Sequence, residues 1–201
     1  MKIFFSPTSP YVRKCMVSAH ELGLVDRIEL LPANAHPVQR DATIIASNPL
    51  GKVPTLITDD GTVLYDSRVI CEYLDDLAGG TLFPRSGAAR WAALSLQSLA
   101  DGMLDAALLA RYETAARPEA LRWNDWLAGQ LDKVATSLAS LEGNTPRLHE
   151  RIDIGTLSLG CALGYLDLRF ADLSWRQRHP NVAHWAARLE KRPSMLAKWS
   201  L

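Results

Sequence analysis

The sequence predicts an α/β part with a mixed four-stranded sheet, followed by a part that is all helix. Strand-like and helix-like segments alternate over residues 1–80, and only helical periodicity follows residue 85. Glycine and proline accumulate in between, at residues 78–84, which is typical of a linker. We therefore expect one domain at residues 1–80 and an all-helical domain at residues 86–201.

The first part has the element order βαβαββα. A β-α-β unit favours a right-handed crossover and a parallel strand pair, and a hairpin with Gly61 in its turn adds two antiparallel strands. Helices would then cover the faces of this sheet. The expected strands are residues 2–5, 27–31, 55–58 and 62–65, and the expected helices are residues 10–22, residues 41–47 and a helix that begins at Ser67 with Val69, Ile70, Tyr73, Leu74 and Leu77 facing inward.

Apolar residues recur at helical spacing throughout the second part. A long helix is expected over residues 86–116, and Pro118 suits the first turn of the next helix. Residues 157–166 are apolar nearly all round, which indicates a buried central helix. The remaining expectations are inward positions at Leu127, Leu131, Val134, Leu138 and Leu141, a break at residues 143–146, and a last helix through Val182, Trp185 and Leu189 that ends near Pro193.

The composition excludes several classes of protein. The 22 basic residues balance the 22 acidic ones, so nothing directs the chain to nucleic acid or to an acidic membrane surface. No apolar run approaches the roughly 18 residues of a membrane span, and the apolar N-terminal run is too short for a signal peptide. The three cysteines and five histidines show neither disulfide nor metal-ligand spacing. These observations predict a cytoplasmic protein without a metal.

The most informative motif is the stretch of residues 48–56, Asn-Pro-Leu-Gly-Lys-Val-Pro-Thr-Leu. Its two prolines fix the backbone and push the preceding residues toward extended geometry, and Gly51 supplies the turn between them. The backbone of Lys52 and Val53 would then be rigid and exposed. Such a backbone pairs with an extended peptide as an added strand does, although a rigid turn without a ligand is the simpler alternative.

Two helix starts offer polar groups. Ser9 lies between a strand and Pro10, where its hydroxyl meets helix N–H groups and the positive end of the helix dipole. That environment suits a bound thiolate, but on its own Ser9 is more simply a helix N-cap. Asp66 and Ser67 open a later helix, where a hydroxyl, a terminal amide and a carboxylate would hold an α-amino acid head group; an ordinary capping pair is again the simpler alternative.

Taken together, these marks resemble the cytosolic glutathione transferases, with a bacterial, serine-type active site. The marks are Ser6-Pro7-Thr8-Ser9-Pro10-Tyr11-Val12-Arg13 after the first strand, the residue 48–56 loop, Asp66-Ser67, and a wholly helical second part. The resemblance covers nearly the whole chain. It implies a thioredoxin-like first domain, a cis-proline loop, glutathione as co-substrate, a homodimer and a role in detoxification. The implied reaction is addition of glutathione to an apolar electrophile bound between the domains.

The resemblance also implies roles for individual residues. Ser9 would hold the glutathione sulfur as thiolate, with Thr8 and Ser6 as the alternative contacts. The Val53 backbone, next to Pro54, would pair with the cysteinyl part. Three further contacts are implied: Asp66 and Ser67 with the γ-glutamyl end, Lys52 with the glycyl carboxylate, and Asp101, four residues before Asp105 on the first long helix, with the partner subunit's glutathione.

Asp153 would cap the buried helix, but the order of acid and hydroxyl departs from the family pattern, so we do not expect a full reciprocal pair with Thr156.

Other interpretations stay open. A non-catalytic binding protein could share the architecture, and so could a glutathione-dependent peroxidase or disulfide reductase. A thioredoxin-type enzyme is disfavoured by the absence of a CxxC motif, and Cys15 falls on an apolar helix face, as a structural cysteine does. The electrophile and the residues of its pocket are not identified; Met103, Tyr112 and Trp199 are candidates, with ordinary packing as the simpler role of each.

Overall fold

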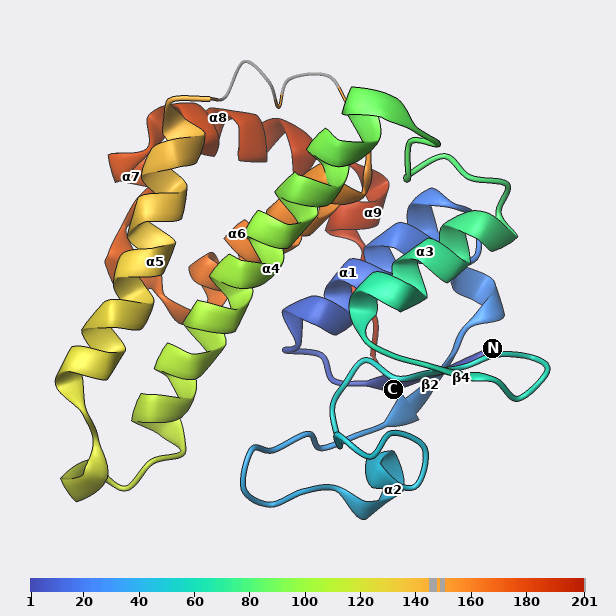
Figure 1. Ribbon diagram of the computed structural model, residues 1–201, viewed down its shortest axis with the longest axis horizontal. Helices are drawn as coiled ribbons and strands as arrows, with labels where there is room; N and C mark the ends of the chain where they lie inside the picture. Colours follow the sequence, from blue (N-terminus) through green and yellow to red (C-terminus); the bar gives the residue numbers. More distant parts are fainter. Residues whose placement is uncertain (145–147, 149–150, 201) are drawn as a thin grey trace. The chain divides into compact units, whose positions relative to one another are not determined.

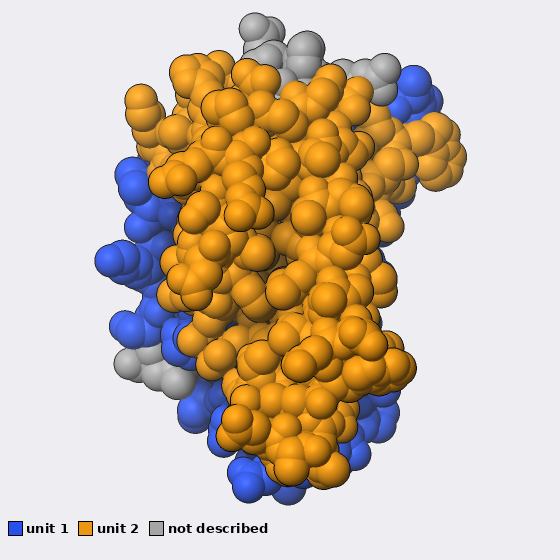
Figure 2. Space-filling view, turned by 90° about the vertical axis from the view of Figure 1, so that its left-hand side faces the viewer, with its two compact units in different colours: residues 1–90, 193–201 blue, residues 91–192 orange. Residues whose placement is uncertain are grey.

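The computed structural model describes residues 1–144, 148 and 151–200. The chain forms two compact units (Figures 1 and 2). Unit 1 comprises residues 1–90 and 193–201, and unit 2 comprises residues 91–192. The domain limits expected from the sequence stay a prediction, and the compact units differ from them by grouping the last residues of the chain with the α/β part.

Unit 1 contains a four-stranded mixed sheet with the strand order β2-β1-β3-β4. Strand β1 is parallel to β2 and antiparallel to β3, and β3 is antiparallel to β4. This confirms the predicted topology, although β3 and β4 are shorter than expected. The strands are β1 (Lys2–Phe5), β2 (Glu29–Pro32), β3 (Leu56–Ile57) and β4 (Val63–Leu64).

Helices lie on both sides of this sheet, with α1 and α3 side by side on one face and α2 on the other (Figure 1). Cys15 of α1 and Cys71 of α3 are buried, with their sulfur atoms 3.9 Å apart. Two predicted inward residues of α3 are exposed instead, Val69 by 47% and Leu77 by 40%, because Cys71 takes the inward position between Ile70 and Leu74. The helices of unit 1 are α1 (Pro10–Glu21), a 3-10 turn (Val25–Arg27), α2 (Ala42–Ile45), α3 (Ser67–Leu77) and α9 (Pro193–Leu196).

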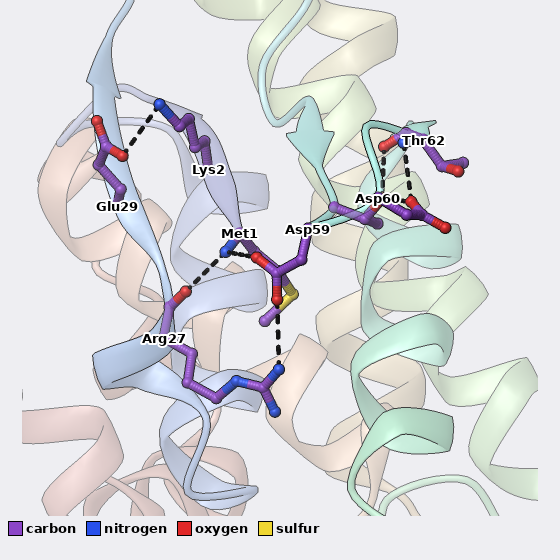
Figure 3. Close-up of polar contacts among 8 residues, drawn as sticks. Met1, Lys2, Arg27, Glu29, Asp59, Asp60 and Thr62 are labelled. Atoms are coloured by element: carbon purple, nitrogen blue, oxygen red, sulfur yellow. Dashed lines mark hydrogen bonds and ion pairs between the residues drawn. The ribbon is translucent and has the colours of Figure 1, made fainter.

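The start of the chain is tied to the β3–β4 hairpin by charged contacts (Figure 3). The Met1 ammonium donates to the Asp59 carboxylate at 2.5 Å and to the Arg27 carbonyl at 3.0 Å. These contacts lower the pKa of Asp59, first through the hydrogen bond from the ammonium group and then through its charge. In the same turn, Asp60 accepts hydrogen bonds from the Thr62 amide and the Thr58 hydroxyl.

The last residues of the chain pack on α1. Arg13 donates to the Met195 carbonyl at 2.6 Å, and Ser194 donates to the Glu21 carboxylate. Unit 1 is therefore built from both ends of the sequence, with all of unit 2 inserted between them.

Unit 2 is helical, and its central helix α6 is buried on almost every side, as predicted. Helix α5 starts at Asn124, later than expected, because Pro118 precedes a short 3-10 turn instead of opening the helix. The expected break at residues 143–146 lies partly outside the described residues; α5 ends at Glu142. The elements are α4 (Gly87–Ala115), which begins in unit 1, a 3-10 turn (Glu119–Leu121), α5 (Asn124–Glu142), α6 (Ile154–Arg169), a 3-10 turn (Ala171–Leu173), α7 (Trp175–Arg178) and α8 (Pro180–Leu189).

The start of α6 corrects one expectation. Asp153 accepts from the Thr156 amide at 3.0 Å, and the Thr156 hydroxyl accepts from the Asp153 amide at 3.0 Å, so the reciprocal capping pair is complete. A hydroxyl accepts as well as donates, so the two residue types exchange positions without loss of either bond. Within the described ranges, no helix is both long and apolar enough to span a membrane.

Candidate functional site

The first component of the site is the junction between β1 and α1. Ser9 is the N-cap of α1, and its hydroxyl accepts from the Val12 amide at 3.3 Å. Pro10 follows as the first helical residue. The Ser9 side chain is partly exposed, so its hydroxyl can still donate to an external group while it accepts from the helix. Ser6 is also partly exposed and Thr8 is exposed, so neither alternative hydroxyl is excluded by burial.

The second component is the loop before β3, which is held from inside by buried polar groups. Asn48, 1% exposed, accepts from the Leu50 amide at 3.0 Å and donates to the Thr55 hydroxyl at 2.9 Å. Thr55 in turn donates to the Lys52 carbonyl at 2.8 Å. Gly51 turns the chain with φ +62, where a Cβ atom would approach the Arg40 side chain to 3.1 Å.

This internal scaffold leaves the Val53 backbone available. Across the part of the chain that the structure describes, neither the amide nor the carbonyl of Val53 makes a hydrogen bond. The peptide bond between Val53 and Pro54 is cis, Pro54 is buried, and Lys52 is exposed. An unpaired donor and acceptor on a rigid loop beside a sheet is the arrangement that pairs with an extended peptide.

The third component is the start of α3. Asp66 is its N-cap and accepts from the Arg68 amide at 2.9 Å, while its carboxylate remains exposed. Ser67, the first helical residue, is 2% exposed. Asp66 thus has the capping role that the simpler interpretation gave it. Its second carboxylate oxygen lies 4.0 Å from the Arg68 guanidinium, in an exposed ion pair that leaves the carboxylate able to accept from an ammonium group as well.

Two contacts, one between backbone groups and one from a side-chain thiol, bring these three components together in unit 1. The Phe4 amide at the end of β1 donates to the Thr55 carbonyl at 2.9 Å, which places the loop beside the strand that leads to Ser9. The Cys15 thiol of α1 contacts the Ser67 carbonyl at 3.8 Å, which joins α1 to the first turn of α3. The predicted residues Ser9, Val53, Asp66 and Ser67 therefore belong to adjoining segments of one unit.

Sequence reasoning missed the residues that hold the loops of this unit in place. Asn48 and Thr55 are buried supports, and their only signal in the sequence is their position around the proline-glycine turn. Asp75 is a third case: its buried carboxylate accepts from the backbone amides of residues 81–83 at 2.8, 2.6 and 3.1 Å. It fixes the glycine-rich segment that follows α3.

The residues that the sequence placed in or near the site outside the three components differ in their burial. Asp101 is 1% exposed whereas Asp105 is exposed, so the burial of Asp101 does not favour the expected contact with a partner subunit, which stays a prediction. Met103 is buried and Tyr112 partly exposed, and in unit 1 Trp199 is partly exposed. The described residues contain no group of three or more metal-binding side chains.

Known proteins similar to this chain share its two-part organisation. The family model "Glutathione S-transferase, N-terminal domain" matches residues 8–77, and "Glutathione S-transferase, C-terminal domain" matches residues 124–188. An Escherichia coli (strain K12) protein described as "Uncharacterized GST-like protein YibF" is 34% identical over 199 residues, covering 96% of each chain.

Solved structures are similar over the whole chain. A glutathione transferase family member from Pseudomonas fluorescens Pf-5 with bound glutathione has a TM-score of 0.96 and 49% identity, covering 100% of this chain and 98% of that one. A second structure from the same organism, with bound S-(propanoic acid)-glutathione, has a TM-score of 0.91 and 48% identity, covering 98% of each chain.

Proposed function

This chain belongs to the glutathione S-transferase family, and from that premise we propose that it binds glutathione in unit 1 and adds its sulfur to a small electrophile. The observation that carries the proposal is the unpaired Val53 backbone, in the same unit as a partly exposed N-cap hydroxyl at Ser9. The similar structures with bound glutathione support the choice of peptide.

The proposed binding mode follows from the donors and acceptors of each component. The Val53 amide and carbonyl pair with the cysteinyl residue of glutathione. The Asp66 carboxylate accepts from the γ-glutamyl ammonium group, and the first turn of α3 at Ser67 holds its carboxylate. Lys52, which is exposed, offers a positive charge to the glycyl carboxylate.

Ser9 is proposed to stabilise the sulfur as thiolate. A thiol has a pKa of about 8.5, and each unit of depression needs about 1.36 kcal/mol of preferential thiolate binding. A single hydrogen bond to a charged group contributes about 1.5–3 kcal/mol, enough to lower the pKa by one or two units. The positive end of α1 adds to this effect. At neutral pH, the bound sulfur would then be largely the nucleophilic anion.

The chemistry is a direct attack by sulfur, without a metal and without a covalent enzyme intermediate. S-(propanoic acid)-glutathione, the compound bound by one similar protein, has the structure that forms when glutathione adds to a three-carbon unsaturated acid. We propose additions of this kind, rather than disulfide reduction or peroxidation, as the reaction type. We also propose that the protein acts in detoxification as a cytoplasmic homodimer.

Substitution of Ser9 tests the thiolate step. Ser9→Ala should raise the pKa of bound glutathione by one to two units, measured as loss of ultraviolet thiolate absorbance at neutral pH. Ser6→Ala and Thr8→Val serve as matched controls and should leave the titration unchanged. S-methylglutathione, which has no ionisable thiol, should bind Ser9→Ala normally and show that the fold is intact.

A different result would reassign the sulfur contact. If Ser9→Ala titrates like the wild type and Thr8→Val does not, the contact is Thr8. If calorimetry detects no binding of glutathione to the wild-type protein at millimolar concentration, the proposed function is wrong, and a non-catalytic role on the same fold is the remaining interpretation.

A further inference from the structure

Two cysteines that lie 56 positions apart in the sequence meet in the core of unit 1. Cys15 belongs to α1 and Cys71 to α3, and these helices lie side by side on one face of the sheet (Figure 1). Both side chains are 0% exposed, and their sulfur atoms are 3.9 Å apart. We call these two reduced cysteines the thiol pair. The fold thus creates a contact that the spacing of cysteines along the chain does not indicate.

The thiol pair is close to the geometry of a disulfide. A disulfide has an S–S distance of about 2.05 Å, so each sulfur has to move by about 1 Å toward the other. Rotation about χ1 moves a cysteine sulfur farther than this while the backbone stays in place. The Cys15 thiol also donates to the Ser67 carbonyl at 3.8 Å. That contact depends on the thiol hydrogen, so it ends when the sulfur forms a disulfide.

Burial limits the reagents that reach the thiol pair. The reactive form of cysteine is the thiolate, and an apolar interior disfavours its charge, so a buried thiol reacts slowly with bulky or charged reagents. Hydrogen peroxide is uncharged and hardly larger than water, and it can enter when the helices open locally. Peroxide is therefore the oxidant that suits this site.

Contact between the two sulfur atoms decides the product of oxidation. A sulfenic acid condenses with a thiol to form a disulfide, or reacts with more oxidant and becomes a sulfinic acid. In unit 1 the second thiol is already in contact with the first, so the condensation is intramolecular. The arrangement therefore favours the disulfide, which is reversible, over the sulfinic acid.

We infer that Cys15 and Cys71 form a modification site, at which peroxide converts the thiol pair into a disulfide between α1 and α3. In the first step, one sulfur gives two electrons to the O–O bond of hydrogen peroxide and becomes a sulfenic acid, and one water is released. In the second step, the other sulfur attacks the sulfenic sulfur and the S–O bond breaks. The hydroxyl leaves with the thiol proton as a second water. A dithiol reductant restores both thiols, and neither glutathione nor an electrophile takes part.

Mass spectrometry of the folded protein tests this modification. Reduced wild-type protein is treated with hydrogen peroxide, freed of peroxide with catalase, unfolded in urea and alkylated with N-ethylmaleimide. Most molecules should then carry one alkyl group instead of the three expected from the three cysteines. Trypsin should release residues 15–27 joined to residues 69–85. Dithiothreitol should restore all three thiols.

Alanine variants assign the link to the thiol pair. Cys161→Ala removes the buried cysteine of α6 in unit 2 as a matched control and should keep the full yield of the link. Cys71→Ala should abolish the link. Should Cys71→Ala not fold, as judged by circular dichroism, Cys15→Ala takes its place. The wild-type peptide map needs neither variant to distinguish a link from its absence.

Wild-type protein that keeps all three thiols would overturn the inference, and so would conversion of either member of the thiol pair to a sulfinic acid without a link. A disulfide that includes Cys161, or one between two copies of the chain, would also overturn it. A link that forms only when peroxide is added in urea would do the same, because the folded contact would then have no part in it. A link that forms in the folded protein, persists in Cys161→Ala and disappears in Cys71→Ala supports it.

Discussion

Asn48 shows how much of the proposed glutathione site depends on a residue that is not among the proposed contacts of the ligand. Its buried amide joins Leu50 to Thr55 across the turn, and so holds the Val53 backbone in place. Ser9 could be named from the sequence because a hydroxyl before a proline marks a helix N-cap, and its proposed role at the sulfur came from the resemblance to glutathione transferases. Asn48 could not, since a buried amide and a surface amide look alike until the turn around them is known.

Gly155 is the residue whose replacement should be most informative for packing. A Cβ atom there would lie 2.5 Å from the Ala93 carbonyl oxygen and 2.9 Å from the Leu96 side chain. Gly155→Ala should therefore destabilise unit 2 by about 1–3 kcal/mol, because the α4–α6 contact must separate. Urea denaturation followed by circular dichroism measures the loss.

Gly164 of the same helix provides the control, since a Cβ atom there would meet no atom of the described residues within 4 Å apart from its own stretch of helix. Gly164→Ala should be neutral or stabilise the protein by up to about 1 kcal/mol through helix propensity. If both substitutions destabilise the protein equally, the close approach of Gly155 to the Ala93 carbonyl does not contribute to the free energy of unfolding.

At the scale of elements, the long helices and the order of strands could be predicted from the sequence, whereas the exact ends of short strands and of α5 could not. The 29-residue helix α4 has enough turns for its apolar periodicity to be unambiguous. Strands β3 and β4 have two residues each, so their limits depend on hydrogen bonds that no sequence pattern records. The delayed start of α5 has the same cause: Pro118 permits a helix start but also permits the 3-10 turn that forms.

Asp75 is the clearest support of one element by another. Its carboxylate accepts hydrogen bonds from the backbone amides of residues 81–83. The sequence does not distinguish it from the neighbouring Asp76, which is exposed. Asp75→Ala would leave buried donors unpaired and should cost at least about 2 kcal/mol. Thermal unfolding should show a clear decrease for Asp75→Ala and almost none for Asp76→Ala. Similar melting of the two variants would show that these amides find other partners.

At the scale of the whole molecule, acid should destabilise the protein through a few carboxyl groups. The carboxyls of Asp41, Asp59, Asp60 and Glu113 have lowered pKa values in the folded state. For Glu113 the first cause is the hydrogen bond from the Trp123 amide, followed in the same direction by the bond from Arg117. The unfolded chain binds protons at a higher pH than the folded one, so this stability is complete above the ordinary pKa of about 4 and is lost as pH falls through the lowered values.

Glu113→Gln tests this linkage, because glutamine keeps an acceptor oxygen but has no charge. The variant should be less stable than the wild type at pH 7, and the difference should shrink as pH falls from about 5 toward 2. Urea midpoints at several pH values measure it. Asp172→Asn, which alters a carboxylate without a hydrogen bond or ion pair among the described residues, should follow the wild-type curve. A gap between Glu113→Gln and wild type that stays constant with pH would contradict this assignment.

The attachment of α9 to α1 has a consequence for biosynthesis. Arg13 and Glu21 bond to residues that are translated 182 and 173 positions later, so the α/β part leaves the ribosome before α9 can cover this side of α1. Unit 1 is thus completed only after the helices of unit 2 have been synthesised. Truncation before α9 would leave α1 uncovered, and we expect unit 1 to be cleaved by protease before unit 2 is.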